Sequence, residues 1–352
     1  MEQSRKKFPV SYELAMNILN RCPASRPGHV VYCTHEALRD RVRETTGLSL
    51  EDAWECDLIW NTDDGPVPWS QLGRVTDMGH AEFMAGGADR RNPGICPFRR
   101  LEEARAFDAV AEYGLPDETA LTAYYEAVCQ NGQRAYPSQV FTGGYYKTLL
   151  SGALEIFGWD MLLQLAADRT AFEAVLDPVF QLSLHHYRCW ARTGVKAFIL
   201  HDDMVWSGGP FLDPDFYRGV IFPRYTALVR LLHDAGKKVL FASDGNWASF
   251  MEDVAATGAD GFIFESAVPL AAMADRFGNS HVLVGSAVDC RTLTFGTRDE
   301  IRAEIDLTLK VTRKCRGLFI AVGNHIPSNV PLENALFYAE YLRRQWRNSH
   351  AL

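Results

Sequence analysis

The sequence lacks several features that define large classes of protein. None of its 352 residues fall in a run of about 18 uncharged apolar residues, so we expect no membrane-spanning helix. Its polar start, Met-Glu-Gln-Ser-Arg-Lys-Lys, leads to no apolar signal-peptide core. Its eight cysteines include no C-x-x-C pair. These absences predict a cytoplasmic protein whose thiols are reduced and mostly buried.

Positive charge and the common nucleotide and hydrolase motifs are also scarce. The net charge is −8, and no stripe of Lys and Arg marks a nucleic-acid surface, so no nucleic-acid partner is expected. No G-x-G-x-x-G, Walker-A loop, G-x-S-x-G or H-E-x-x-H occurs. The sequence therefore does not support dinucleotide, NTP, serine-hydrolase or zincin chemistry.

What the chain does contain is eight short apolar runs, spread over nearly its whole length. Such runs are typical of parallel strands that helices cover on both faces. Eight of them, alternating with helical segments, predict a (β/α)₈ barrel. The runs begin at His29, Asp57, Ser138, Lys196, Lys238, Gly261, His281 and Gly317.

Helical periodicity separates most of the runs, and it predicts one domain over 1–352 with its core at about 9–347. An N-terminal helical extension precedes the first strand, and long insertions follow the second and third strands at 63–100 and 143–167. We expect both insertions to be loops over the barrel mouth. The predicted helices are 36–42, 170–192, 214–235, 247–257, 298–313 and 331–347.

Each apolar run stops at polar residues, and catalytic groups of such barrels come from the carboxyl ends of the strands. Asp202 and Asp203 follow the fourth run, where they either cap the next turn or serve a ligand. Asp244 and Asn246 follow the fifth run, as helix caps or as ligands. His325 follows the eighth run, as a structural donor, a metal ligand or an acid/base.

Several of these endings resemble the uroporphyrinogen decarboxylase superfamily. The segments that carry the resemblance are Asp202-Asp203, Leu212-Asp-Pro-Asp-Phe216 with Pro223-Arg224-Tyr225, Phe241-Ala-Ser-Asp-Gly-Asn246, and Gly323-Asn-His-Ile-Pro-Ser-Asn-Val-Pro-Leu-Glu-Asn334. The resemblance implies a (β/α)₈ barrel and one of two chemistries. One is decarboxylation of a tetrapyrrole without cofactor or metal, and the other is methyl transfer to or from a corrinoid protein, usually with zinc.

The decarboxylase alternative rests on Asp64, which resembles the essential aspartate of those enzymes. Their arginine-containing first strand ending is replaced here by Cys33-Thr34-His35-Glu36. Uroporphyrinogen carries eight carboxylates, and its site should present several Lys or Arg side chains. The strand endings hold acidic residues without one Lys or Arg, which favours a metal or a cation over a polyanion.

The methyltransferase alternative also departs from one known pattern, because the cysteines of the thiol-methylating relatives are replaced by residues such as Asp244 and Asn324. Zinc held by Asp244, Glu265 and His325 would then act as a Lewis acid on a methoxylated or methylated substrate. This resembles the branch that passes methyl groups to cobalt(I) of a separate corrinoid-binding protein.

The sequence thus predicts a corrinoid-dependent methyltransferase, with a divergent uroporphyrinogen decarboxylase or a non-catalytic corrinoid- or tetrapyrrole-binding protein as alternatives. A small-molecule methyl donor and a corrinoid-binding protein are the expected partners, and a homodimer is considered. The predicted catalytic residues are Asp202, Asp203, Asp64 and Tyr145, the substrate-binding residues are His35, Asp77, His80, Asn246 and Asn324, and the zinc ligands are Asp244, Glu265 and His325.

Overall fold

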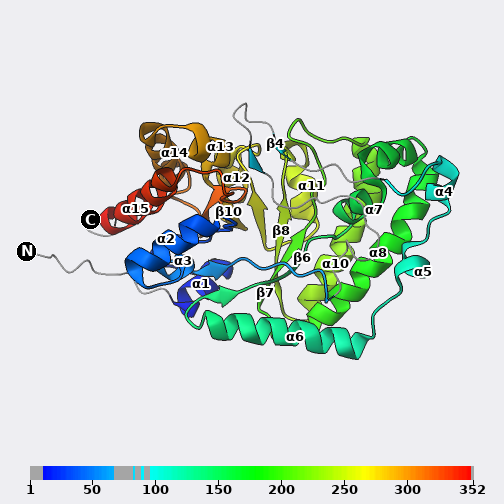
Figure 1. Cartoon of the computed structure of the whole chain (residues 1–352), viewed down its shortest axis with the longest axis horizontal. Coiled ribbons are helices and arrows are strands. Elements are labelled where there is room, and N and C mark those ends of the chain that lie inside the picture. The colour runs from blue at the N-terminus through cyan, green and yellow to red at the C-terminus, as the bar shows by residue number, and fades with distance from the viewer. Residues whose placement is uncertain (1–10, 67–81, 84–88, 91–95, 350–352) are drawn as a thin grey trace, which may run out of the picture.

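A parallel sheet that curls into a barrel organises the molecule in a computed structural model, which describes residues 11–66, 82–83, 89–90 and 96–349 (Figure 1). Seven strands pair in the order β1-β11-β10-β9-β8-β7-β6, all in parallel. They are β1 Gly28–His29, β6 Gly143–Tyr145, β7 Ala197–His201, β8 Lys238–Ser243, β9 Gly261–Phe264, β10 Val282–Asp289 and β11 Gly317–Gly323.

Two short strands close the gap between β1 and β6. β2 (Leu58–Ile59) pairs in parallel with β5 (Val140–Phe141), which runs on into β6. On the other side, the Asp57 N–H donates to the His29 carbonyl over 2.8 Å, which joins β2 to β1. The strands therefore complete the (β/α)₈ barrel that the apolar runs predict.

Helices surround the barrel, and all six helices predicted from periodicity are present with small shifts of their ends. Two depart in detail. The 214–235 segment contains a π-helical turn, Tyr217–Ile221, between α9 and α10, and the 247–257 segment begins with a 3-10 turn, Ala248–Phe250, before α11. The helices after the third strand are α7 Leu150–Ala166, α8 Arg169–Ala191, α9 Pro214–Phe216, α10 Phe222–Asp234, α11 Met251–Ala256, α12 Leu270–Phe277, α13 Cys290–Phe295, α14 Arg298–Val311 and α15 Leu332–Ser349. Before it lie α1 Tyr12–Leu19, α2 Glu36–Thr46, α3 Leu50–Ala53, α4 Leu101–Arg105, α5 Ala109–Tyr113 and α6 Glu118–Ala135.

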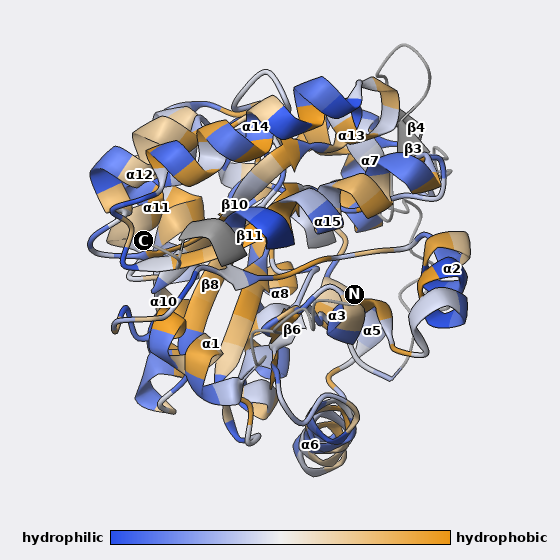
Figure 2. Cartoon of the chain, turned by 90° about the vertical axis from the view of Figure 1, so that its left-hand side faces the viewer, coloured by the Kyte–Doolittle hydropathy of each residue, from blue (hydrophilic) through white to orange (hydrophobic). Residues whose placement is uncertain are grey.

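Local sequence explains where these helices begin and which face they bury. In α14, Thr297 and Glu300 form a reciprocal capping box, and Ile301 and Ile305 face the barrel. Figure 2 shows the result: the central strands are apolar, and the surrounding helices turn their hydrophilic sides outward. Among the described residues, no helix combines the length and apolar character needed to cross a membrane.

The predicted N-terminal extension is α1, and it seals the end of the barrel opposite the strand carboxyl ends. Leu14, Ile18 and Leu19 pack against inward-facing strand residues such as Leu58 and Phe319 in a separate apolar cluster. This packing removes the lower barrel from solvent, which leaves the upper end as the place for a cavity.

Of the two predicted loop insertions, the one after the third strand differs from expectation. Most of the 143–167 segment is a helix, α7 (Leu150–Ala166), kinked at Gly158, where φ is +70°. Its sequence is apolar all around, as suits a buried helix rather than a surface loop. In the 63–100 segment the structure describes an antiparallel strand pair, β3 (Glu82–Phe83) with β4 (Asp89–Arg90), while Asp77 and His80 lie outside the described residues.

Candidate active site

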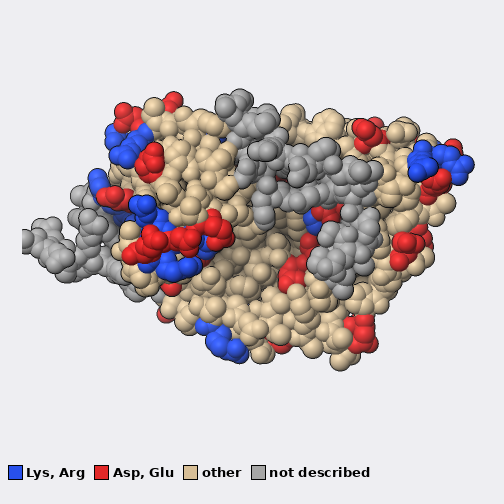
Figure 3. Space-filling model, in the orientation of Figure 1, with Lys and Arg blue, Asp and Glu red and all other residues tan. Residues whose placement is uncertain are grey.

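A cavity of about 310 Å³ lies inside the upper barrel, at the carboxyl ends of the strands. Its lower wall is apolar and its upper wall is polar. The lining residues are Val30, Tyr32, Trp60, Thr62, Tyr146, Lys147, His201, Ala242, Ser243, Asp244, Ile263, Phe264, Glu265, Val284, Ala321, Val322, Asn324 and His325. On the face drawn in Figure 3, a hollow near the centre has acidic side chains beside it.

The alternation of side chains along a strand explains much of this lining. Along β8, Leu240 packs in the lower barrel, and Ala242 and Asp244 line the cavity above it. Along β7, Ala197 lies in the same lower layer and His201 lines the cavity. Inward positions therefore meet at one place, although they come from distant parts of the sequence.

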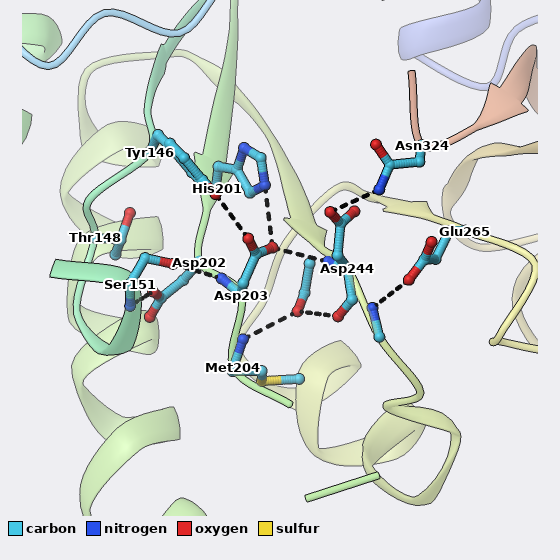
Figure 4. Close-up of polar contacts among 12 residues, drawn as sticks. Tyr146, Thr148, Ser151, His201, Asp202, Asp203, Met204, Asp244, Glu265 and Asn324 are labelled. Atoms are coloured by element: carbon cyan, nitrogen blue, oxygen red, sulfur yellow. Dashed lines mark hydrogen bonds and ion pairs between the residues drawn. The ribbon is translucent and has the colours of Figure 1, made fainter. Parts of the chain in front are cut away.

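Asp203 is the centre of a polar network beside the cavity (Figure 4). Its carboxylate accepts hydrogen bonds from the Tyr146 hydroxyl over 2.8 Å and from the Asp244 N–H over 3.0 Å. His201 Nε2 lies 3.3 Å from the same carboxylate. Burial alone would raise the pKa of Asp203, but the hydrogen bond and charge of His201 and the two donors hold that pKa well below its usual range. Asp203 is therefore a permanent anion that orients His201 and Tyr146.

A second network joins the ends of β8 and β11. The Asn324 amide donates to Asp244 Oδ2 over 2.9 Å, and its Oδ1 lies 2.5 Å from His325 Nδ1. Asn324 has a φ of +72°, a region that Asn tolerates better than most residues. This backbone geometry lets a single amide hold both an acidic and an imidazole side chain at the cavity wall.

Glu265 follows β9 and faces the same cavity. Its Oε1 accepts a hydrogen bond of 2.6 Å from the N–H of Gly245, whose φ of +80° and tight packing on the Val205 carbonyl suit only glycine. Burial raises the pKa of Glu265, the Gly245 N–H opposes the shift, and the charge of Asp203 adds to it. Glu265 therefore holds a proton more readily than an exposed glutamate does.

Lys147 is a cavity residue that the sequence analysis missed. It lies two residues beyond β6, is buried, forms an ion pair with Glu155 of α7, and sits 4.1 Å from the centre of the Tyr146 ring. The premise that the mouth holds no Lys or Arg is therefore wrong. Because a buried carboxylate already pairs with this ammonium, it adds little net charge.

Asp202 does not line the cavity, although it was predicted to be catalytic. Strand alternation turns it outward, and it is fully buried between the barrel and the helices. It accepts hydrogen bonds from the N–H groups of Leu150 and Ser151 and from the Tyr225 hydroxyl, at 2.9, 2.6 and 2.5 Å. Asp202 therefore fixes the start of α7, which precedes it in the sequence, rather than the next turn that the capping alternative named.

Tyr145, which was also predicted to be catalytic, is likewise turned away from the cavity. Its buried ring stacks on His186 of α8, with centroids 4.8 Å apart. The next residue, Tyr146, is the one that lines the cavity. Asp64 accepts a 2.8 Å hydrogen bond from the Tyr146 N–H and so supports that residue from outside the lining.

Two predicted substrate-binding residues make local backbone contacts instead. His35 caps α2 by accepting from the Leu38 N–H, and its Nε2 lies 3.0 Å from the Val330 carbonyl. Asn246 accepts from the Ala248 N–H. Both side chains are used locally, so of the predicted substrate-binding residues that the structure describes, Asn324 is the one that lines the cavity.

The predicted zinc ligands share the cavity wall but do not fit a zinc site. Among the described residues, no three His, Cys, Asp or Glu side chains come together as a metal site. Asp244 Oδ2 and His325 Nδ1 both bond to Asn324, and Glu265 Oε1 bonds to a backbone N–H. These donors are therefore not gathered around one point in the described structure, and zinc stays a prediction that follows from the resemblance.

Comparisons with known proteins agree with this architecture. The model of the family described as uroporphyrinogen decarboxylase (URO-D) matches residues 158–345. A methyltransferase from Methanosarcina mazei superposes with a TM-score of 0.66 at 16% identity, covering 97% of this chain and 100% of that one. No curated protein matches the sequence.

Two further solved structures are much less similar. The YdhT protein from Bacillus subtilis has a TM-score of 0.40 at 10% identity, covering 91% of this chain and 88% of that one. A B12-independent methionine synthase from Shewanella sp. W3-18-1 has a TM-score of 0.39 at 10% identity, covering 92% and 98%. These two carry no argument, but the family model spans more than half of the chain. The protein belongs to the uroporphyrinogen decarboxylase (URO-D) family.

Proposed function

We propose that this protein is a methyltransferase that moves a methyl group from a small methoxylated or methylated substrate to the corrinoid of a separate carrier protein. The observation that carries the proposal is the composition of the cavity. It has a volume of about 310 Å³ and combines apolar walls with the carboxylates of Asp244 and Glu265. Such a site suits a compact, largely apolar molecule with one polar or cationic end.

The same composition argues against the decarboxylase alternative. An octacarboxylate needs several guanidinium or ammonium partners. Among the described lining residues, Lys147 is the one Lys or Arg, and it pairs with Glu155. Asp64 is the residue on which that alternative rests. It lies outside the described lining and accepts a hydrogen bond from the Tyr146 N–H.

The chain offers groups that position a substrate and move a proton. Asp203 holds His201 through Nε2, and His201 Nδ1 is buried without a hydrogen-bond partner among the described residues. When a methoxylated donor gives up its methyl group, the oxygen that remains is an oxyanion and needs a proton. His201 or Glu265 would supply that proton from the cavity wall. Asn324 keeps Asp244 facing the bound substrate.

The corrinoid enters this proposal as a co-substrate, whose cobalt(I) takes the methyl group. Zinc, when bound by relatives, supplies a Lewis acid. The described side chains do not form a zinc site, so no step here depends on one. The carrier protein would approach the carboxyl ends of the strands, where the cavity lies.

The proposal is tested by mixing the purified protein with cob(I)alamin and a panel of methyl donors, namely methanol, methoxybenzoates, methylamines and quaternary ammonium compounds. Methyl transfer converts the cob(I)alamin spectrum to that of methylcobalamin. We expect one class of donor to react, and we expect Asp203→Asn to slow the reaction because His201 loses its ionic partner. Metal analysis of the same sample establishes which ions accompany the active protein.

A matched control is Asp213→Asn, because Asp213 caps α9 away from the cavity lining. This variant should react like the unaltered protein. Conversion of uroporphyrinogen to coproporphyrinogen, with no donor in the panel reacting, would overturn the proposal in favour of the decarboxylase alternative.

A further inference from the structure

Aromatic rings form a continuous row along one side of the cavity. Tyr32 lies between His325 and Trp60, with centroid distances of 5.9 and 5.7 Å. Trp60 then meets His201 edge-on at 5.7 Å, and His201 lies 4.2 Å from Tyr146. All five residues line the cavity. The row joins five separate strand ends, those of β1, β2, β6, β7 and β11, so the barrel brings together rings that are far apart in the sequence.

Carboxylates complete the cavity beside this row. Asp244 and Glu265 line it from the ends of β8 and β9, and Asp203 lies next to Asp244. Lys147 pairs with Glu155, so it does not balance these groups. The described site therefore combines a row of aromatic side chains with several carboxylates.

We propose that the methyl donor is a methylated ammonium ion, bound by Tyr32 and Trp60 with Asp244 and Glu265 as its counter-charges. This inference rests on the proposed methyl transfer and names the substrate class for it. Ring faces attract an alkylated cation through their quadrupole, and aromatic cages with carboxylates recognise quaternary ammonium groups. A methylated ammonium ion also matches the apolar lower wall, because its methyl groups need no hydrogen bonds.

The chemistry of this methyl donor suits the side chains that line the cavity. When the methyl group leaves a quaternary ammonium ion, the C–N bond breaks and its electron pair stays on nitrogen. The product is a neutral tertiary amine, and the electron pair of cobalt(I) in the carrier's corrinoid forms the new bond to carbon. The step consumes no proton and needs no Lewis acid on the leaving group. It therefore does not require a metal site built from Asp244, Glu265 and His325.

Binding can be tested without turnover by comparing choline with 3,3-dimethylbutan-1-ol, its uncharged carbon isostere. Isothermal titration calorimetry of the whole protein near pH 7.5 gives both affinities. We expect choline to bind about tenfold or more tightly than the alcohol, as one cation–π contact and a carboxylate imply. Equal affinities, or tighter binding of the alcohol, would overturn the inference.

Four variants locate the site. Trp60→Leu and Asp244→Asn should each weaken choline binding by about tenfold while leaving the alcohol's affinity within about twofold. Trp206→Leu is the matched control, because this indole is 45% exposed and lies outside the cavity lining. Tyr32→Phe keeps the ring and should preserve choline binding. This conservative variant remains informative if Trp60→Leu does not fold. Choline affinity that falls equally in all four variants would also overturn the inference.

The failure of this inference differs from the failure of the proposed function. If a methoxylated donor methylates cob(I)alamin but choline and tetramethylammonium do not bind, the substrate class is wrong and methyl transfer stands. If the cations bind with the expected variant pattern but no donor in the panel transfers a methyl group, the cation site stands and the proposed function is wrong.

Discussion

The two ends of the barrel both bury carboxylates, but they balance them differently. At the lower end, Asp57 is fully buried and forms a bidentate pair with Arg26, at 2.7 and 3.0 Å, and also accepts from the His29 N–H. At the upper end, Asp203 and Asp244 accept hydrogen bonds from uncharged groups, with His201 as the titratable partner of Asp203.

This difference suggests that the lower carboxylate serves stability and the upper carboxylates serve function. A guanidinium does not lose its proton, so the lower pair is neutral as a unit whenever Asp57 is ionised. The upper carboxylates keep their negative charge for whatever enters the cavity. The predictions that follow test this contrast, from the largest expected effect to the smallest.

The largest effect is expected at the lower end. Arg26→Ala should lower the free energy of unfolding by about 3–5 kcal/mol, because Asp57 is left buried without its counter-charge. Urea denaturation measures the loss. Arg344→Ala, which breaks an exposed pair with Glu340, should cost less than about 1 kcal/mol. Equal losses in the two variants would contradict the distinction between the buried and exposed pairs.

A smaller effect is expected where Asp202 caps α7. Asp202→Ala removes three hydrogen bonds and leaves buried donors unsatisfied, at a cost of about 1–3 kcal/mol in unfolding free energy. Because Asp202 does not line the described cavity, choline affinity of the folded variant should stay within about twofold. A tenfold loss of choline affinity with unchanged stability would show that Asp202 acts in ligand binding.

Asp203 should make stability depend on acid pH. Its lowered pKa means that the ionised carboxylate stabilises the fold above the unfolded value of about 3.9, and that this contribution is lost as pH falls below it. Denaturation between pH 6 and pH 2 should therefore show a shallower pH dependence in Asp203→Asn than in the unaltered protein. Identical slopes would show that the network around Asp203 contributes nothing.

The smallest effect concerns cation binding at acid pH. Because the pKa of Glu265 is raised, its carboxylate is neutralised at a higher pH than that of an exposed glutamate, so choline affinity should fall severalfold as the pH is lowered from 7.5 into the acid range. The other titratable groups at the wall are Asp203, Asp244, His201, His325, Lys147, Tyr32 and Tyr146. Glu265→Gln should flatten the change, and an unaltered pH profile in that variant would exclude Glu265 as the titrating group.

The sequence could predict the barrel because continuous apolar runs report burial on both faces of a strand. It could not predict which residue of a pair points inward. Asp202 and Asp203, and likewise Tyr145 and Tyr146, differ by one position, and strand alternation sends them to opposite sides. A one-residue shift in the expected strand end was enough to misplace two predicted catalytic residues.

Long-range pairing was also beyond the sequence. Lys147 lies within the segment expected to be a loop, and nothing local shows that it enters the cavity and pairs with Glu155. The helical character of α7 was readable, since its residues are apolar on every side. Asp77 and His80 remain predictions, because they lie outside the described residues.

The most direct test of the central claim follows the methyl carbon itself. The protein would be incubated with cob(I)alamin and choline labelled with ¹³C in its methyl groups, and methylcobalamin would be isolated and analysed by NMR. The account predicts labelled methylcobalamin and one equivalent of dimethylaminoethanol, formed about tenfold more slowly by Asp244→Asn. Absence of label from methylcobalamin with choline and with every methoxylated or methylated donor would contradict methyl transfer in this cavity.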